Sequence, residues 1–180
     1  MPIEKTETGV LLSVPNACCE IRYFGATIID WTVSGTQKIF LSKAATLGGP
    51  KAIRGGIPLV FPHFGKVATS PLPQHGFARV SVWDFETIDT DHPSQATVSF
   101  SLSPKNVSKD YQGMWAFKGD WKVVYTVSLT PSSLETKFTV RNTSSSQNMV
   151  FTCLLHTYLT IKVCVSFQVY GRRRLTPTRV

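Results

Sequence analysis

The sequence lacks the features of a membrane protein, a secreted protein or a disulfide scaffold. No apolar run approaches the roughly 20 residues that span a bilayer. Residues 1–10 include Glu4, Lys5 and Glu7 and contain no apolar stretch of signal-peptide length. The four cysteines form no Cys-x-x-Cys pair, so we expect buried free thiols rather than disulfides. These absences predict a soluble, cytoplasmic protein.

Acidic residues are missing from the C-terminal part of the chain, because no Asp or Glu follows Glu135. Residues 1–135 hold twelve Lys and Arg against eleven Asp and Glu, a balance of +1, whereas residues 136–180 carry +7 of the net charge of +8. A basic end of this kind can bind polyanions, although such runs are more often simply solvated. Since the rest of the chain is nearly neutral, we expect no nucleic-acid partner.

The common cofactor and nucleophile motifs are also absent. The sequence contains no Gly-x-Gly-x-x-Gly, no Walker loop and no Gly-x-Ser-x-Gly elbow. His63, His75, His92 and His156 show no spacing typical of metal ligands, so we expect neither a zinc nor an iron centre.

Short strand-like segments dominate what is present. They lie at residues 10–14, 20–24, 28–33, 38–41, 78–87, 96–102, 121–129 and 134–140. Turn residues separate them, among them Pro15-Asn16 and Ser34-Gly35. No stretch keeps a helical apolar period for three turns. In a 180-residue chain with 42% hydrophobic residues, this pattern predicts one all-β domain, an antiparallel sandwich or barrel.

Two regions depart from this pattern of short strands and turns. Residues 44–77 form a long segment rich in Gly and Pro, and its three phenylalanines favour an ordered loop that packs over a sheet. At the other end, apolar residues alternate over 161–169 and predict one more strand, followed by a basic tail at 171–180.

Three residues stand out as candidates for chemistry. Arg54 and Arg79 lie beside glycines, which allow a close approach of backbone to a ligand, and guanidinium groups suit phosphate and carboxylate. The alternative is two solvated arginines in surface turns. His156 lies in an apolar run, where it is either a core histidine with a satisfied hydrogen bond or a proton donor in a cleft.

A set of short motifs resembles the glucose-6-phosphate 1-epimerases (hexose-6-phosphate mutarotases), which are relatives of the aldose 1-epimerases. In order, they are Gly25-Ala26-Thr27-Ile28, Phe40-Leu41-Ser42, Lys51-Ala52-Ile53-Arg54-Gly55-Gly56-Ile57-Pro58, Gln74-His75-Gly76-Phe77-Ala78-Arg79 and Leu155-His156-Thr157-Tyr158. Each motif alone is weak, but their shared order and spacing over roughly residues 9–160 identify the chain as similar to this family.

The resemblance implies a galactose-mutarotase-like β-supersandwich and interconversion of the α and β anomers of a hexose 6-phosphate. The reaction opens the sugar ring by acid/base chemistry and needs no metal or organic cofactor. By position in the motifs, His156 is the expected general acid. The expected substrate-binding residues are Lys51, Arg54, Gln74, His75 and Arg79.

The chain also departs from the family pattern. The resemblance implies a general-base glutamate far downstream, and this sequence has no carboxylate after Glu135. We therefore expect a supersandwich that is incomplete at the C-terminus, with a mutarotase-like domain at 1–162 and a divergent basic tail at 163–180. The prediction is an epimerase with little or no turnover in this form, or alternatively an inactive phosphosugar-binding fragment, monomeric if complete.

Overall fold

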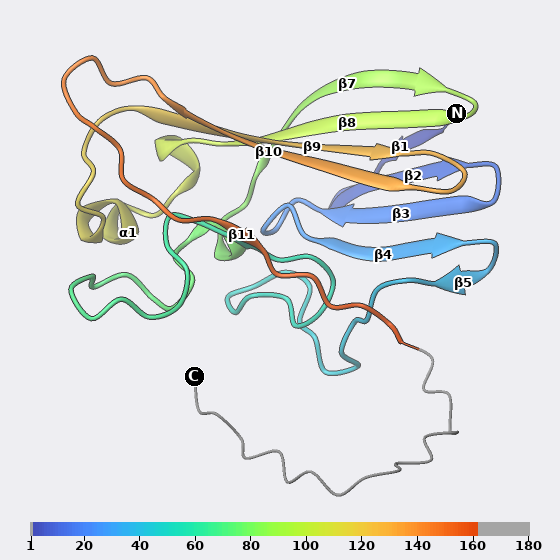
Figure 1. Ribbon diagram of the computed structural model, residues 1–180, viewed down its shortest axis with the longest axis horizontal. Coiled ribbons are helices and arrows are strands. Elements are labelled where there is room, and N and C mark those ends of the chain that lie inside the picture. Colours follow the sequence, from blue (N-terminus) through green and yellow to red (C-terminus); the bar gives the residue numbers. More distant parts are fainter. Residues whose placement is uncertain (1, 162–180) are drawn as a thin grey trace, which may run out of the picture.

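The computed structural model describes residues 2–161, which form two antiparallel sheets and a short third one (Figure 1). The first sheet has the order β1 (Ile3–Lys5), β2 (Gly9–Val14), β3 (Ala17–Arg22), β4 (Ile28–Val33) and β5 (Thr36–Gln37). The second has the order β10 (Leu134–Asn142), β9 (Trp121–Leu129), β8 (Gln95–Leu102) and β7 (Asp84–His92). The third pairs β6 (Leu59–Val60) with β11 (Leu154–Leu155). The all-β prediction is confirmed.

Tight turns connect the strands of the first sheet where the sequence predicts them. Pro15 and Asn16 join β2 to β3, with Asn16 at a φ of 65°. Ser34 and Gly35 join β4 to β5, with φ values of 49° and 70°. Positive φ at both turn residues matches the right-handed twist of the flanking strands, so this turn sets the register of the hairpin.

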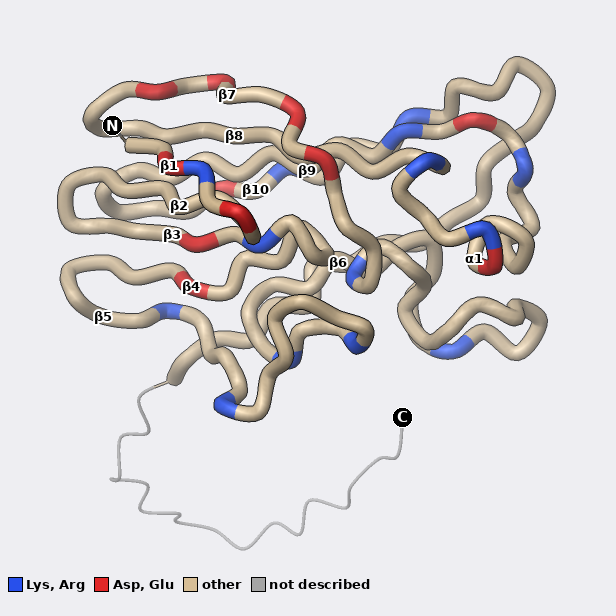
Figure 2. Tube along the Cα trace, turned by 180° about the vertical axis from the view of Figure 1, so that it is seen from behind, with Lys and Arg blue, Asp and Glu red and all other residues tan. Residues whose placement is uncertain are grey.

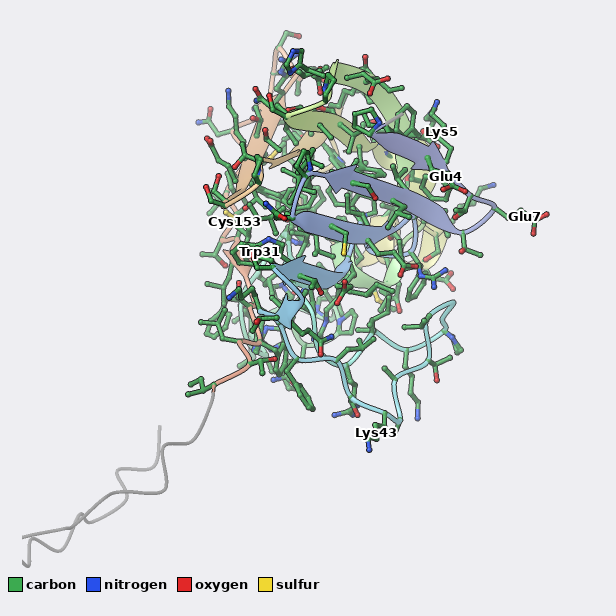
Figure 3. The ribbon with its side chains drawn as sticks, turned by 90° about the vertical axis from the view of Figure 1, so that its right-hand side faces the viewer. Glu4, Lys5, Glu7, Trp31, Lys43 and Cys153 are labelled. Carbon is green, nitrogen blue, oxygen red and sulfur yellow. The ribbon has the colours of Figure 1, made fainter. Side chains whose placement is uncertain are left out.

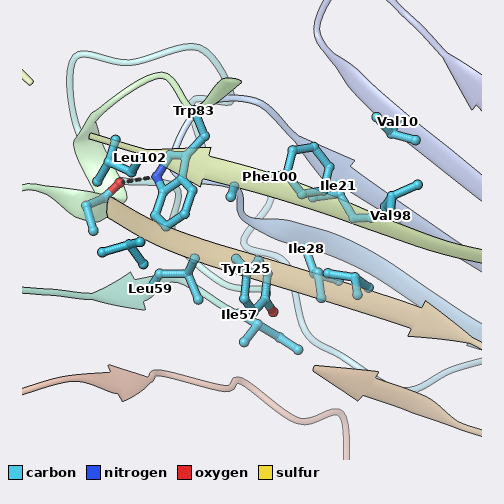
Figure 4. Close-up of a cluster of buried hydrophobic side chains, with 14 of the residues drawn as sticks. Val10, Ile21, Ile28, Ile57, Leu59, Trp83, Val98, Phe100, Leu102 and Tyr125 are labelled. Atoms are coloured by element: carbon cyan, nitrogen blue, oxygen red, sulfur yellow. Dashed lines mark hydrogen bonds between the residues drawn. The ribbon is translucent and has the colours of Figure 1, made fainter. Parts of the chain in front are cut away.

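The core lies between the two larger sheets (Figure 4). Val10 and Ile21 of the first sheet face Val98, Phe100 and Tyr125 of the second, and each of these side chains is at most 1% exposed. Strand β9 shows how the sequence specifies this face: its residues alternate between fully buried and half-buried over its whole length. Period-two burial is what an antiparallel strand with one face on the core requires.

The outer face of β8 carries polar side chains, and they are nevertheless buried. Its Thr97 and Ser99 hydroxyls hydrogen-bond across the sheet to Ser128 and Thr126 of β9, each at 2.8 Å. Because each hydroxyl has a partner, these side chains can be buried without the cost of an unsatisfied polar group.

The irregular segment at 44–77 is ordered, as predicted, and it packs on the core through aromatic rings. Phe61 is fully buried, and its ring centroid lies 5.5–6.2 Å from the ring centroids of five other aromatic residues. Phe77 is also fully buried, whereas Phe64 is 54% exposed. Two of the three phenylalanines therefore anchor the segment, and the third faces outward.

Three strand predictions are wrong in part. The strand predicted at 20–24 is β3, which begins at Ala17 and ends at Arg22. The chain leaves the β4–β5 hairpin after Lys38, whose N–H still donates to the carbonyl of Trp31 at 2.8 Å. Ile39 then forms a bridge with Leu159, and Leu41 forms one with Gly55. Residues 78–87 begin as a 3₁₀ turn, η1 (Ala78–Val80), and β7 starts only at Asp84. Local hydrogen bonds close that turn: Val80 N–H donates to the carbonyl of Phe77, and Trp83 Nε1–H donates to the carbonyl of Ala78 at 2.9 Å (Figure 4).

The connection between β8 and β9 contains the 3₁₀ turn η2 (Pro104–Asn106) and the helix α1 (Lys109–Met114). The hydroxyl of Ser108 caps the helix by accepting from Tyr111 N–H at 3.3 Å. Six residues are too few to produce the three-turn period sought in the sequence. Within residues 2–161, no helix is both long and apolar enough to span a bilayer.

Figure 3 views the first sheet from the side, with Glu4 and Lys5 on β1 and Lys43 in the loop beyond β5.

The thiol prediction is correct in part: Cys18, Cys19 and Cys153 are free, but only Cys19 is buried and Cys153 is exposed. The predicted strand at 161–169, except for Ile161, and the predicted tail lie outside the described residues, as does Cys164.

Candidate active site

A cleft of about 360 Å³ opens where four separate segments of the chain meet. The segments are residues 51–58, residues 73–80, α1 and residues 156–158. All six residues singled out by the family resemblance line it: Lys51, Arg54, Gln74, His75, Arg79 and His156. The structure thus brings together residues that are up to about a hundred positions apart, while their chemical roles stay predictions.

The pairing of β11 with β6 positions His156. Leu154 and Leu155 pair with Val60 and Leu59, and the next N–H, that of His156, donates to the carbonyl of Pro58 at 2.9 Å. His156 is half-buried and its ring faces the cleft, against His75 and Tyr158. The apolar run around His156 is therefore an edge segment beside the cleft, and the core-histidine alternative is wrong.

Glycines let the chain segments around the cleft approach each other closely. Gly56 has a φ of 68°, and a Cβ there would lie 2.1 Å from the carbonyl oxygen of Ile28. Gly76 has a φ of 69°, and a Cβ there would lie 2.2 Å from the carbonyl oxygen of Phe61. The close approach expected for a ligand is in fact made by the backbone of the same chain, and it places Arg54 and His75 at the cleft.

His75 is buried and its ring is oriented by the backbone. The ring Nδ1 accepts a hydrogen bond from Gly65 N–H at 3.1 Å, and the backbone N–H of His75 donates to the carbonyl of Gly65 at 2.9 Å. Burial lowers the pKa of His75, and the nearby charges of Arg79, His156 and His63 lower that pKa further. The neutral ring therefore carries its proton on Nε2, where it can donate to a bound oxygen.

Arg79 sits on η1 and is held by the segment that carries Gln74. Its Nη2 donates to the carbonyl of Gln74 at 2.7 Å. Burial lowers the pKa of Arg79, the side chain of Tyr158 opposes that effect, and Arg54 adds to it. The guanidinium stays charged, because even a lowered arginine pKa lies far above neutrality.

The surroundings of the cleft are strongly basic. Between Asp30 and Asp84 the sequence has no acidic residue, yet it has six Lys and Arg. In Figure 2 the loops beyond β5 carry blue segments only, whereas red segments lie on the strands of the two sheets. Three of the six cations line the cleft: Lys51, Arg54 and Arg79. Unpaired guanidinium and ammonium groups gathered in one concave site favour an anionic ligand.

Two tyrosines that line the cleft were not among the expected site residues. Tyr158 lies two positions after His156 in an extended segment, so both side chains point to the same side, and that spacing could have revealed it. Tyr111 comes from α1, and no local pattern links it to the other segments. Among residues 2–161, no three His, Cys, Asp or Glu side chains are grouped so that they could hold a metal ion.

Comparison with known proteins agrees with this fold. The sequence profile described as "Aldose 1-epimerase" matches residues 10–172. The "Putative glucose-6-phosphate 1-epimerase" of Cenchrus ciliaris is 33% identical over 181 residues, which cover 93% of this chain and 52% of that protein. The chain thus spans about half the length of this relative.

Solved structures extend the comparison to three dimensions. The "putative mutarotase (YeaD)" of Salmonella typhimurium matches with a TM-score of 0.65 at 22% identity, covering 77% of this chain and 46% of that one. A galactose mutarotase-like protein of Clostridium acetobutylicum matches with a TM-score of 0.61 at 17% identity, covering 79% and 49%. The fold is that of the galactose-mutarotase-like proteins, and the chain belongs to the aldose 1-epimerase family.

Proposed function

We propose that this chain binds a hexose 6-phosphate and acts in the interconversion of its α and β anomers. The observation that carries the proposal is the cleft itself, where His156 stands among Lys51, Arg54 and Arg79. A titratable proton donor beside a cluster of cations suits a substrate that has both a phosphate and a ring to open.

Anomer exchange needs one proton donor and one proton acceptor. A base removes the proton of the anomeric hydroxyl while an acid protonates the ring oxygen, so that the C1–O5 bond breaks and a free aldehyde forms. Rotation about C1–C2 and the reverse transfers give the other anomer. His156 is the proposed acid, and such a group contributes about 10²–10⁴ in rate.

The cations provide the proposed phosphate site. Arg54 and Arg79 each offer a planar fork of N–H donors that matches phosphate oxygens, and Lys51 adds a third positive charge. Gln74 and the Nε2–H of His75 are left to bind sugar hydroxyls, because Nδ1 of His75 is already bonded to Gly65 N–H. For this function we propose a cytoplasmic protein with the sugar phosphate as its partner.

A second candidate function is phosphosugar binding without turnover. The described residues that line the cleft include no Asp or Glu, and the sequence has no carboxylate after Glu135. The family resemblance implies a glutamate as the base. Without a base the ring-opening step loses its proton acceptor, whereas binding of the phosphate needs only the cations.

Magnetisation-transfer NMR on glucose 6-phosphate tests both candidates with the same protein. Exchange above buffer that falls by about 10²–10⁴ in His156→Gln, and not in His92→Gln, supports the enzyme. His92 is a matched control because it is exposed on β7, away from the cleft. Exchange that is unchanged in His156→Gln overturns the proposed acid.

Binding separates the second candidate from the first. Binding of glucose 6-phosphate that exceeds binding of glucose, weakens in Arg79→Gln and comes without exchange supports a binding protein. If neither binding nor exchange occurs in protein that circular dichroism shows to be folded, both candidates fail.

A further inference from the structure

The ring of His156 is held differently from the rings of the other three histidines. His63 Nε2 lies 3.1 Å from the carbonyl oxygen of Pro73, His75 Nδ1 accepts from Gly65 N–H, and His92 Nδ1 lies 2.9 Å from Ser94 Oγ. Within residues 2–161, His156 has no hydrogen bond at either ring nitrogen. No described residue therefore occupies either nitrogen, and another interaction has to orient the ring.

Aromatic contacts are the interactions that can orient it. The ring of Tyr158 stacks on His156, with centroids 4.9 Å apart and planes inclined by 27°. The ring of His75 meets His156 edge-on, with centroids 5.8 Å apart and planes inclined by 72°. A stacked ring on one side and an edge on the other restrict rotation of the imidazole, while its nitrogens stay open to the cleft.

The backbone of Tyr158 is well anchored, so its ring can serve as a fixed surface. Its N–H donates to the carbonyl of Gly56 at 2.9 Å, and its carbonyl accepts from Phe40 N–H at 2.8 Å. Tyr158 thus lines the same cleft as the proposed acid and the proposed phosphate site.

We propose that Tyr158 is a positioning residue, whose ring sets the orientation of His156 in place of the hydrogen bond that the other histidines have. The inference rests on the proposed role of His156 as the general acid. A proton donor is effective only within a narrow range of distance and angle to the ring oxygen, so loss of the stacked ring lowers the rate without removing the acid.

Two substitutions at Tyr158 separate the ring from its hydroxyl. Tyr158→Phe keeps the stacked ring, and Tyr158→Leu removes it while leaving the backbone hydrogen bonds possible. The first readout is the NMR spectrum of the histidine rings, in which His156→Gln identifies the His156 signals and His92 is an internal control. A stacked ring shifts the ring-proton signals of its neighbour upfield. We expect Tyr158→Leu to abolish that shift for His156 only, and Tyr158→Phe to keep it. Unchanged His156 signals in Tyr158→Leu overturn the proposal, whether or not the chain turns over its substrate.

The second readout is anomer exchange of glucose 6-phosphate. We expect kcat to fall by about 10–100-fold in Tyr158→Leu, with KM nearly unchanged, and to recover in Tyr158→Phe. If His156→Gln lowers exchange and Tyr158→Leu does not, the positioning role fails while the proposed function stands. If His156→Gln leaves exchange unchanged, the proposed function fails, and the NMR shifts alone decide whether Tyr158 orients the ring.

Discussion

The two large sheets and the cleft region are built on different principles. In the sheets, each strand pairs with a strand close to it in sequence, through hairpins such as β2–β3 and β9–β10. In the cleft region, two pairings join positions about a hundred residues apart: β6 with β11, and Ile39 with Leu159. The sheets therefore depend on local turn and alternation signals, whereas the cleft depends on contacts that form only once the chain has folded.

Irregular backbone nevertheless does not mean loose packing. Phe61 lies in the irregular segment and is as deeply buried as Leu12 of β2, with both at 0% exposure. The two regions thus differ in the sequence separation of their contacts and in backbone geometry, and matched substitutions in the two regions test that difference.

The largest effect is expected from the core on each side of this comparison. Phe61→Ala removes a ring that touches five other aromatic residues and should cost about 3–5 kcal/mol of unfolding free energy. Leu12→Ala in the first sheet should cost about 2–5 kcal/mol. Urea unfolding measures both. A loss well below 1 kcal/mol for Phe61→Ala would mean that the irregular segment is not part of the core.

A pair of glycines with the same backbone angle provides a sharper test. Gly35 has a φ of 70° in the β4–β5 turn and open space around it, whereas Gly56 has a φ of 68° and the carbonyl oxygen of Ile28 in the way of a Cβ. Gly35→Ala should cost about 1–2 kcal/mol, from the left-handed backbone alone. Gly56→Ala should cost about 2–5 kcal/mol, because overpacking adds to that strain. Thermal unfolding compares the two, and equal losses would contradict the close approach at Gly56.

Ligand binding should be sensitive to cations in the cleft and insensitive to cations elsewhere. Arg54→Gln removes a charged donor from the proposed phosphate site and should weaken binding of glucose 6-phosphate about 10–100-fold, since a hydrogen bond to a charged group contributes about 1.5–3 kcal/mol. Lys43→Gln is the control, because Lys43 is an exposed cation in the same loop region that does not line the cleft (Figure 3). Titration calorimetry measures both variants. An equal effect of the two would indicate general charge attraction and no defined site.

The smallest expected effect is on the pH dependence of stability. The folded-state pKa of His75 is lowered, so between that value and the unfolded value near 6.5 the unfolded chain binds more protons than the folded one. The free energy of unfolding should therefore decrease as the pH falls below about 6.5 and level off below the folded pKa. His75→Gln should flatten this part of the profile, and His92→Gln should not. Urea unfolding between pH 7 and pH 5 measures it, and an unchanged slope in His75→Gln would rule out a role for His75.

The first sheet and the β8–β9–β10 meander were largely predictable from the sequence. Residues 28–33 and 121–129 coincide with β4 and β9, because alternation and turn residues are local signals. Prediction failed at 38–41 and at 78–87 for two different reasons. In the first case the chain leaves the sheet to pair with residues far along the sequence, and in the second a set of side-chain and backbone hydrogen bonds closes a 3₁₀ turn.

The candidate site, too, was predictable from the sequence only in part. The chemical types at Arg54, Arg79 and His156 suggested anion binding and proton transfer. Spacing alone could not distinguish these roles from solvated surface arginines and a core histidine. The family resemblance grouped them, and the fold placed them around one cleft together with Tyr158.

By itself, the sequence determined the all-β class, most strand positions and the basic character of residues 31–83, because alternation, turn chemistry and charge are properties of neighbouring residues. The tertiary structure alone decided that His156 lies in a cleft and not in the core. It also decided that Tyr158 stacks on the His156 ring and that Gly56 and Gly76 face backbone instead of ligand. His156 reaches the cleft because segments about a hundred residues apart pack together, as Phe151 does against the buried Phe61, and no pattern of neighbouring residues contains such a contact.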